Sequence, residues 1–358
     1  MDVKKLQDIF LKTDIAPSVI GQDEVKKHTK SALVSGRHMI IVGPPGVGKT
    51  TLARNIASLL PEEEISDDPF DYVSTGSKKD DKKANKKTEK EESKKISGLG
   101  RFVRVQGSPD LTAEDLLGDI DPIKAMKYGP LSIEAFTPGK IFKANKGILF
   151  FDEVNRCSEK LQNSLLQVLE EGNVTIGGYD VEFDLDFVFI GTMNPKDFST
   201  ENLSDVFLDR FDLVKMGYPK ELEIEKRIVK DNSRPILSSS KANRRIMNII
   251  VSYTRSLRNS QKLERFPSVR ATIGVFERAQ ANALIDGRKD MKMSDFKEAL
   301  DSVLSHRIKL KPSVKYMQSP TEVLEEEFNS FAKANNIDTE DADDGSSETP
   351  GDDTGESG

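Results

Sequence analysis

The sequence lacks the residues from which disulfide frameworks and metal clusters are built. It has one cysteine and three histidines among 358 residues, which excludes an internal disulfide, a cysteine zinc cluster and an ordinary all-protein transition-metal site. A membrane helix needs about 20 consecutive apolar residues, and no stretch approaches that length. The first ten residues contain no apolar signal-peptide core. We therefore expect a soluble, cytoplasmic protein.

Charge is concentrated at one end of the chain. The net charge is -7, yet residues 338–358 alone contain nine acidic residues and no basic one, so the remainder carries +2. A nearly neutral folded part provides no global basic field, and the sequence does not indicate a nucleic-acid partner.

Composition divides the chain into two folded domains and a tail. Residues 1–220 alternate strand and helix patterns, whereas residues 221–331 contain helical patterns alone. Residues 332–358 are rich in Asp, Gly and Ser, and we expect them to be disordered.

A lysine-rich segment interrupts the first domain. Residues 77–95 contain nine Lys and five acids, and no apolar residue larger than Ala84. Such a segment cannot bury enough surface to offset its ordering entropy. We expect a disordered insertion over about 77–97; the alternative is a solvated charged helix.

Apolar patterning predicts the elements of an α/β core. Strands that alternate with helices indicate a mainly parallel sheet covered on both faces, followed here by a small all-α domain. A Gly-Gly pair between two β-rich runs indicates an inserted β-hairpin. The predicted strands are 38–42, 102–106, 148–151 and 187–191, the hairpin is 174–183, and the predicted helices are 22–35, 50–60, 158–171 and 269–285.

A phosphate-binding loop follows the first strand. Residues 43–50, GPPGVGKT, match the pattern G-x-x-x-x-G-K-[ST] between a predicted strand and a predicted helix. Glycines let backbone N–H groups surround phosphates, and the helix N-terminus adds a favourable dipole. Lys49 is then expected at the β- and γ-phosphates and the Thr50 hydroxyl on Mg²⁺. The alternative is a Gly-rich turn with an incidental Lys-Thr pair.

Two adjacent acids end the third predicted strand. Asp152 and Glu153 follow an apolar run, and strand C-termini in open α/β sheets face the ligand crevice. Asp152 can hold Mg²⁺ or its waters, and Glu153 can orient and polarise an attacking water, which favours hydrolysis. Two solvated acids at a helix start are the alternative.

Three further polar residues lie at the ends of elements. Asn194 follows the fourth predicted strand and can read the γ-phosphate or the water, or it is a turn former before Pro195. Arg210 ends an apolar helical turn, where the alternative is a surface ion pair with Asp209 or Asp212. Arg270 lies off the apolar stripe of helix 269–285 and either turns toward the nucleotide or is solvated.

The ordered set of motifs resembles the AAA+ ATPases. Three features resemble the MoxR and magnesium-chelatase I-subunit group in particular: an acidic motif with its helix, a β-hairpin, and a helical lid. The similarity covers roughly residues 10–315. The general motifs are IGQ (20–22), GPPGVGKT (43–50), FFDE (150–153), GTMNP (191–195), LDRF (208–211) and PSVR (267–270), and the group features are 151–156 with 161–170, 174–183, and 267–271 with 286–288 and 306–307.

This resemblance implies a P-loop NTPase core with a helical lid, an ATP and Mg²⁺ requirement, and a homo-hexameric ring with ATP between subunits. It implies Asn194 as sensor 1, Arg210 as an arginine finger acting in trans and Arg270 as sensor 2, beside Glu153 as the water-activating residue. The nucleotide-binding set that it implies is Ile20, Gly21, Gly43, Pro44, Pro45, Gly46, Val47, Gly48, Lys49, Thr50, Thr51 and Asp152, with Thr50 and Asp152 on Mg²⁺.

Two details of the resemblance leave alternatives open. Residues 130–143 look like the group's helix-2 insertion facing the ring axis, and Phe136 there is either a pore contact or simple hairpin packing. Arg156 is either an extra interface arginine or the partner of Asp152 or Glu153 in a salt bridge.

The resemblance favours an ATP-driven remodelling motor. Members of this group typically act with a partner that carries a von Willebrand factor A domain, and the target is a protein complex that needs maturation. The alternatives are a magnesium-chelatase motor subunit that drives metal insertion into a porphyrin, a DNA-translocating ring helicase, and a nucleotide-binding scaffold without turnover. No OB-fold, zinc module or winged-helix segment supports the helicase, and the presence of Glu153, Asn194 and Arg210 argues against the scaffold.

Overall fold

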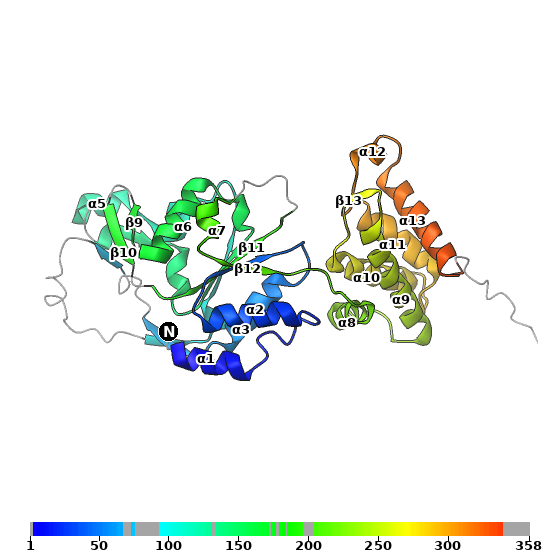
Figure 1. Ribbon diagram of the computed structural model, residues 1–358, viewed down its shortest axis with the longest axis horizontal. Helices are drawn as coiled ribbons and strands as arrows, with labels where there is room; N and C mark the ends of the chain where they lie inside the picture. The colour runs from blue at the N-terminus through cyan, green and yellow to red at the C-terminus, as the bar shows by residue number, and fades with distance from the viewer. Residues whose placement is uncertain are drawn as a thin grey trace, which may run out of the picture. The chain divides into compact units, whose positions relative to one another are not determined.

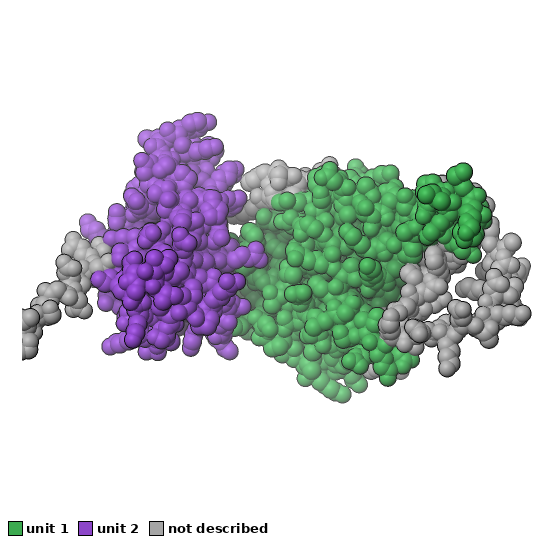
Figure 2. Space-filling view, turned by 180° about the vertical axis from the view of Figure 1, so that it is seen from behind, with its two compact units in different colours: residues 1–221 green, residues 222–358 purple. Residues whose placement is uncertain are grey.

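The chain divides into two compact units, residues Met1–Glu221 and Leu222–Gly358 (Figure 2). No helix in the described part of the chain is long and apolar enough to cross a membrane. The structure, a computed structural model, describes residues 3–66, 73–75, 93–129, 133–171, 173–176, 179–183, 185–195 and 203–338.

The core of the first unit is a five-stranded parallel sheet in the order β12-β1-β11-β8-β5. Figure 1 labels two of its strands, β11 and β12. This confirms the predicted parallel sheet and adds β12, which the sequence patterns did not predict. The strands are β1 (Met39–Val42), β5 (Phe102–Gln106), β8 (Ile148–Asp152), β11 (Val188–Met193) and β12 (Asp212–Lys215).

Apolar side chains of each central strand divide between two cores on opposite faces of the sheet. In β1, Met39 and Ile41 belong to one cluster and Ile40 to the other. In β8, Phe150 and Phe151 divide in the same way, and both are completely buried. Burial on both faces explains why these strands are continuous apolar runs.

Helices cover both faces of this sheet, as expected from the alternating patterns. The first core contains buried residues of α2 and α3, and the second contains those of α6. The helices of the unit are α1 (Val3–Lys12), α2 (Asp23–Val34), α3 (Lys49–Leu59), α4 (Ala113–Leu117), α5 (Pro122–Tyr128), α6 (Glu159–Glu171) and α7 (Asp205–Leu208).

Short antiparallel strands lie outside the main sheet. The predicted hairpin is present as β9 (Asn173–Ile176) paired with β10 (Tyr179–Phe183), and β3 (Val73–Thr75) pairs with the other side of β10. The Gly-Gly turn between β9 and β10 lies outside the described residues. Strand β6 (Gly118–Ile120) pairs with β7 (Phe136–Pro138).

The C-terminal end of the predicted insertion is ordered, contrary to expectation. Ser93–Ile96 form strand β4, which pairs antiparallel with β2 (Glu63–Ser66). Directly after β4, a Cβ atom on Gly98 would lie 2.0 Å from the Ala57 carbonyl oxygen of α3. Backbone pairing and this close approach therefore fix a segment that composition alone marks as disordered. Residues 76–92 of the insertion lie outside the described residues.

Two matched replacements test where the dispensable part of the insertion ends. Replacing residues 77–92 with a short Gly/Ser linker should leave the thermal midpoint within a few degrees of wild type, because β4 is retained. Replacing residues 77–96 with the same linker removes β4 and its pairing with β2. Each kcal/mol lost should lower the midpoint by about 2–4 °C in a domain of this size. Equal midpoints for both variants in a thermal melt would show that β4 contributes nothing to stability.

The second unit is built from helices around one apolar core, as the sequence predicts, with one short two-stranded pair in addition. The expectation of disorder from residue 332 is wrong at its start, because the last helix continues to Ala334 and Ile337 packs against the core. Glu225 is fully buried in this unit, and its carboxylate accepts hydrogen bonds from Arg255 and Arg258 at 2.7–2.8 Å. The elements are α8 (Leu222–Asn232), α9 (Lys241–Ser256), β13 (Leu263–Arg265), α10 (Val269–Ile285), α11 (Met293–Leu304), β14 (Lys309–Leu310), α12 (Pro312–Lys315) and α13 (Pro320–Ala334).

Candidate functional site

The glycine-rich loop connects β1 to α3, as its pattern predicts. Gly46 and Gly48 adopt left-handed backbone angles, with φ of 74° and 104°, a region that residues with a side chain rarely enter. At Gly43 a Cβ atom would lie 2.0 Å from the carbonyl oxygen of Met216, so only glycine fits. These constraints shape a loop whose amides can surround a polyphosphate, and the loop therefore fits the predicted nucleotide.

Lys49 is the first residue of α3 and lies over the loop. Its ammonium Nζ donates hydrogen bonds to the carbonyls of Gly43 at 2.6 Å and Pro44 at 3.0 Å. The start of α3 adds the positive end of the helix dipole at the same place. Thr50 follows Lys49 and is half-buried, and Thr51 is exposed. A cation and a helix N-terminus thus converge where anionic phosphates are expected.

Asp152 and Glu153 lie at the C-terminal end of β8, and Thr192 of β11 connects them. The Thr192 hydroxyl donates to Asp152 Oδ1 at 2.7 Å and accepts from the Glu153 backbone N–H at 2.9 Å. The other Asp152 oxygen, Oδ2, accepts from Arg104 of β5 at 2.6 Å. Mg²⁺ is commonly held by one or two carboxylates together with substrate phosphates, so a single carboxylate beside the loop suits it.

Glu153 is held in an unusual backbone conformation. Its φ of 59° is left-handed, which is costly for a residue with a side chain and is frequent at functional sites. Its Oε2 accepts a hydrogen bond from Gln106 at 3.0 Å and lies 3.1 Å from Nε of Arg156. Of the two alternatives for Arg156, the structure therefore contains the intrasubunit salt bridge to Glu153.

Asn194 follows β11 beside the start of the phosphate loop. The backbone N–H of Gly43 donates to the carbonyl of Met193 at 3.0 Å, and Asn194 itself is half-buried. Parallel pairing of β1, β11 and β8 thus brings the loop, Asn194 and the two acids to the same edge of the sheet.

The predicted adenine-side residues are connected to the loop through the segment that follows β12. Ile20 and Gly21 are half-buried, and Gly21 has a left-handed φ of 67°. The next side chain, Gln22, donates to the carbonyl of Gly217 at 2.9 Å. Gly217 directly follows Met216, whose carbonyl abuts Gly43, so this N-terminal segment lies near the loop.

Arg210 contacts a different part of the unit. Its side chain forms an ion pair with Glu170 of α6, donates to the Val206 carbonyl at 3.2 Å and lies 3.9 Å from Asp209. The Glu170 carboxylate, as hydrogen-bond acceptor and charge partner, raises the pKa of Arg210. Figure 1 shows α7, which precedes Arg210, beside α6. The surface ion pair considered as its alternative role is thus present, with Glu170 as the main partner.

The two remaining predicted residues belong to different units, Phe136 to the first and Arg270 to the second. Arg270 is exposed in the first turn of α10, in the second unit. Phe136 is 1% exposed and packs against Phe142, with ring centroids 5.8 Å apart. Of its two alternatives, Phe136 therefore has the packing role in this structure.

Sequence reasoning missed three residues around the acidic pair: Arg104, Gln106 and Thr192. Gln106 ends a correctly predicted strand and stands opposite Asp152 in the β5–β8 register, but strand order is not visible in the sequence. Thr192 lies in the GTMNP motif, two residues before Asn194, and this place in the motif is a signal that the sequence offers.

Three family models match the chain in succession. Residues 15–95 match "Magnesium chelatase, subunit ChlI", residues 92–211 match "AAA domain (dynein-related subfamily)", and residues 258–327 match "AAA lid domain". Together they cover most of the two units.

Curated relatives align along nearly the whole chain. A protein of Methanocaldococcus jannaschii called "Magnesium-chelatase subunit ChlI homolog" is 29% identical over 348 residues, 90% of this chain and 92% of the relative. The Bacillus subtilis protein YeaC is 25% identical over 337 residues, 88% and 91% of the two chains. Among solved structures, the complex of the magnesium-chelatase subunits BchI and BchD has a match with a TM-score of 0.45 and 19% identity, covering 85% of this chain and 98% of that one.

Proposed function

We propose that this chain, which belongs to the AAA+ ATPases of the MoxR and magnesium-chelatase I-subunit group, hydrolyses ATP with Mg²⁺ to remodel or mature a protein complex. One arrangement supports turnover more than any other. Thr192 bonds to both Asp152 and Glu153, and its strand pairs with the strand that enters the phosphate loop. A scaffold that only bound nucleotide would not need a second, strained carboxylate at this place.

Each residue of the site has a distinct task in this proposal. Lys49, which now bonds to the loop carbonyls, would neutralise the β- and γ-phosphates, and Thr50 and Asp152 would hold Mg²⁺. Glu153 orients and polarises the attacking water, and Asn194 reads the γ-phosphate or that water. Bound ATP and Mg²⁺ supply the reactive phosphoryl group and the charge that stabilises its transfer. Arg104 now donates to Asp152 Oδ2, so this contact would have to open for that oxygen to hold the metal.

The site is completed by a second copy of the chain in a homo-oligomeric ring, for which we propose six subunits. Arg210 is the arginine finger that acts on a neighbour, and Arg270 of the lid is sensor 2. The structure supports this for Arg210 in one respect: within its own subunit it contacts α6 and α7 rather than the phosphate loop.

We propose a protein with a von Willebrand factor A domain as the partner, because the group's MoxR members typically act with one. A magnesium-chelatase motor subunit is an equally supported second candidate. A specific observation favours it: the magnesium-chelatase family model matches residues 15–95, which include the whole phosphate loop. In that case the ring drives metal insertion into a porphyrin with the other chelatase subunits.

Phosphate release measured with ATP and Mg²⁺ tests the activity that both candidates share. We expect release above that of the same chain in EDTA, since Asp152 and Thr50 need the metal to position the phosphates. ATP binding without phosphate release would instead support the scaffold. Adding purified partners then separates the candidates: stimulation by a von Willebrand factor A protein supports remodelling, and metal insertion into a porphyrin with chelatase subunits supports the chelatase.

A further inference from the structure

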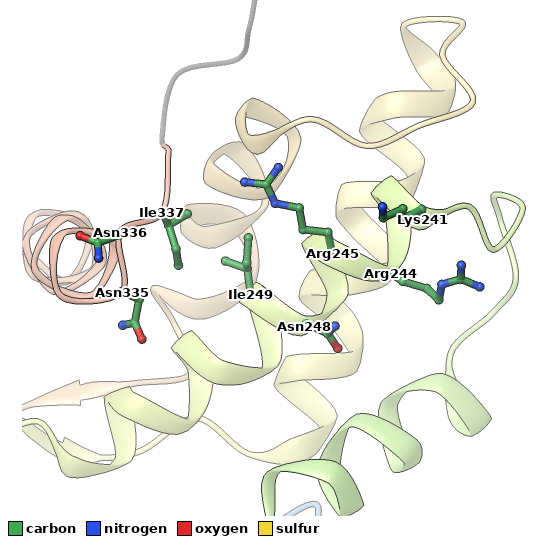
Figure 3. Close-up of a pocket in the computed structure, with 8 residues that line it drawn as sticks. All are labelled: Lys241, Arg244, Arg245, Asn248, Ile249, Asn335, Asn336 and Ile337. Carbon is green, nitrogen blue, oxygen red and sulfur yellow. The ribbon is translucent and has the colours of Figure 1, made fainter.

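The second unit contains a basic pocket that none of the roles above uses. It is a hollow of about 580 Å³ between the first turns of α9 and the segment that follows α13 (Figure 3). Lys241, Arg244, Arg245 and Asn248 contribute from α9, and Asn335 and Ile337 lie on the other side.

The cations of this pocket have no acidic partner in the described part of the chain. No carboxylate lines the pocket, and the ion pairs of the described residues involve none of Lys241, Arg244 and Arg245. All three residues are exposed. They also lie near the N-terminus of a 16-residue helix, whose dipole adds to the attraction for anions. The pocket is therefore built for an anionic ligand.

The chain leaves α13 at the wall of this pocket. The Ile337 N–H donates to the carbonyl of Ala332 at 2.9 Å, and Asn336 has a left-handed φ of 51°. This cap turns the backbone, and the Ile337 side chain packs against the apolar core of the unit. The position of Ile337 is thus fixed, and the acidic tail begins at the next residue, Asp338.

We propose that this pocket binds acidic peptide and that its occupant is the chain's own tail, residues 339–358. The tail supplies eight carboxylates and no basic residue. Arginine guanidinium groups pair with carboxylates through two parallel hydrogen bonds, the strongest ion-pair geometry in proteins. Because the tail is joined directly to the pocket wall, its effective concentration there is on the order of millimolar. Weak individual ion pairs then suffice for occupancy.

The pocket cations can attract only anionic groups that come close to them. Exposed charges are screened beyond about 8 Å at physiological salt, so only acids close to the pocket contribute. Nucleic acid would need a continuous basic surface, whereas residues 1–337 carry a net charge of only +2. The peptide is therefore favoured over phosphate groups of nucleic acid.

Zero-length cross-linking of the full chain tests this proposal. A carbodiimide joins the Lys241 amine to a carboxylate in contact with it, and mass spectrometry identifies the acid. We expect adducts between Lys241 and residues 340–344 at low salt, which fall as salt is raised to about 0.5 M. The double variant Arg244→Glu/Arg245→Glu should lower them about tenfold, because two attractive charges become repulsive.

The control is Arg278→Glu/Lys315→Glu, which makes the same change in charge on exposed residues of the same unit outside the pocket. It should leave the adducts unchanged, and both variants should have the wild-type thermal midpoint. Equal adducts in the pocket and control variants would overturn the proposal. So would tail adducts spread over all exposed lysines, adducts between isotopically labelled and unlabelled chains, or DNA binding that the pocket variant alone abolishes.

Discussion

Glu153→Gln is expected to leave ATP binding intact and to lower ATP turnover by about 10²–10⁴. The amide keeps the shape of the side chain and its place beside Gln106 and Arg156, but it cannot polarise a water. Phosphate release and binding of a fluorescent ATP analogue, measured on the same preparation, separate the two effects. Turnover at the wild-type rate would remove Glu153 as the water-activating residue.

Two matched variants make this result specific. Lys49→Ala should lose binding itself, because the loop loses the cation that now bonds to its own carbonyls. Glu159→Gln makes the same chemical change as Glu153→Gln in an exposed carboxylate at the start of α6. If Glu159→Gln lowered turnover as much as Glu153→Gln, the effect would come from losing any carboxylate of this unit and not from losing the one at this site.

The phosphate loop and the acidic pair could be predicted because their signals are local. A strand, a glycine pattern and a helix follow one another within residues 38–60, and β8 is an apolar run that ends in Asp152. The left-handed φ of Glu153, in contrast, cannot be predicted from the neighbouring residues in the sequence. The surrounding bonds from Thr192 and Gln106 hold it, and these residues come from two other strands.

The unpredicted parts depend on contacts between distant segments. Gln106 and Arg104 reach the acidic pair only because β5 lies next to β8 in the sheet, and composition does not report strand order. The order of β4 arises in the same way. Its residues are lysine-rich and weakly β-forming, yet pairing with β2 and the close packing of Gly98 on α3 define it. The composition of this segment was described correctly, but contacts with distant parts of the chain determine that it is ordered.

Arg210→Ala is expected to abolish turnover while each subunit still binds ATP. In phosphoryl transfer an arginine finger is worth roughly 10³–10⁵ in rate. Within its own subunit Arg210 is paired with Glu170, and that pair has to open when the guanidinium reaches a neighbour's phosphate. If Arg210 instead had only a structural role within its own subunit, loss of its partner Glu170 would lower turnover as much as loss of Arg210 itself.

Glu170→Ala therefore distinguishes the two roles. It removes the partner of Arg210 but leaves the guanidinium, so turnover should stay near wild type if Arg210 acts on a neighbour. Surface ion pairs are worth about 0–1 kcal/mol, so neither substitution should unfold the chain, and thermal melts verify this. Inactivation by both substitutions alike would assign Arg210 to the stability of the α6–α7 contact.

Mixing two inactive variants is the decisive measurement for action in trans. Lys49→Ala chains lack nucleotide binding but keep Arg210, and Arg210→Ala chains keep an intact loop. A mixed ring contains some interfaces with an intact loop on one side and an intact arginine on the other, so hydrolysis should partly recover on mixing. Native mass measurement shows whether the variants have assembled together. Mixed rings without recovered hydrolysis would place Arg210 in cis or require coupling of the whole ring, because each complete interface would already hold every group that the reaction needs.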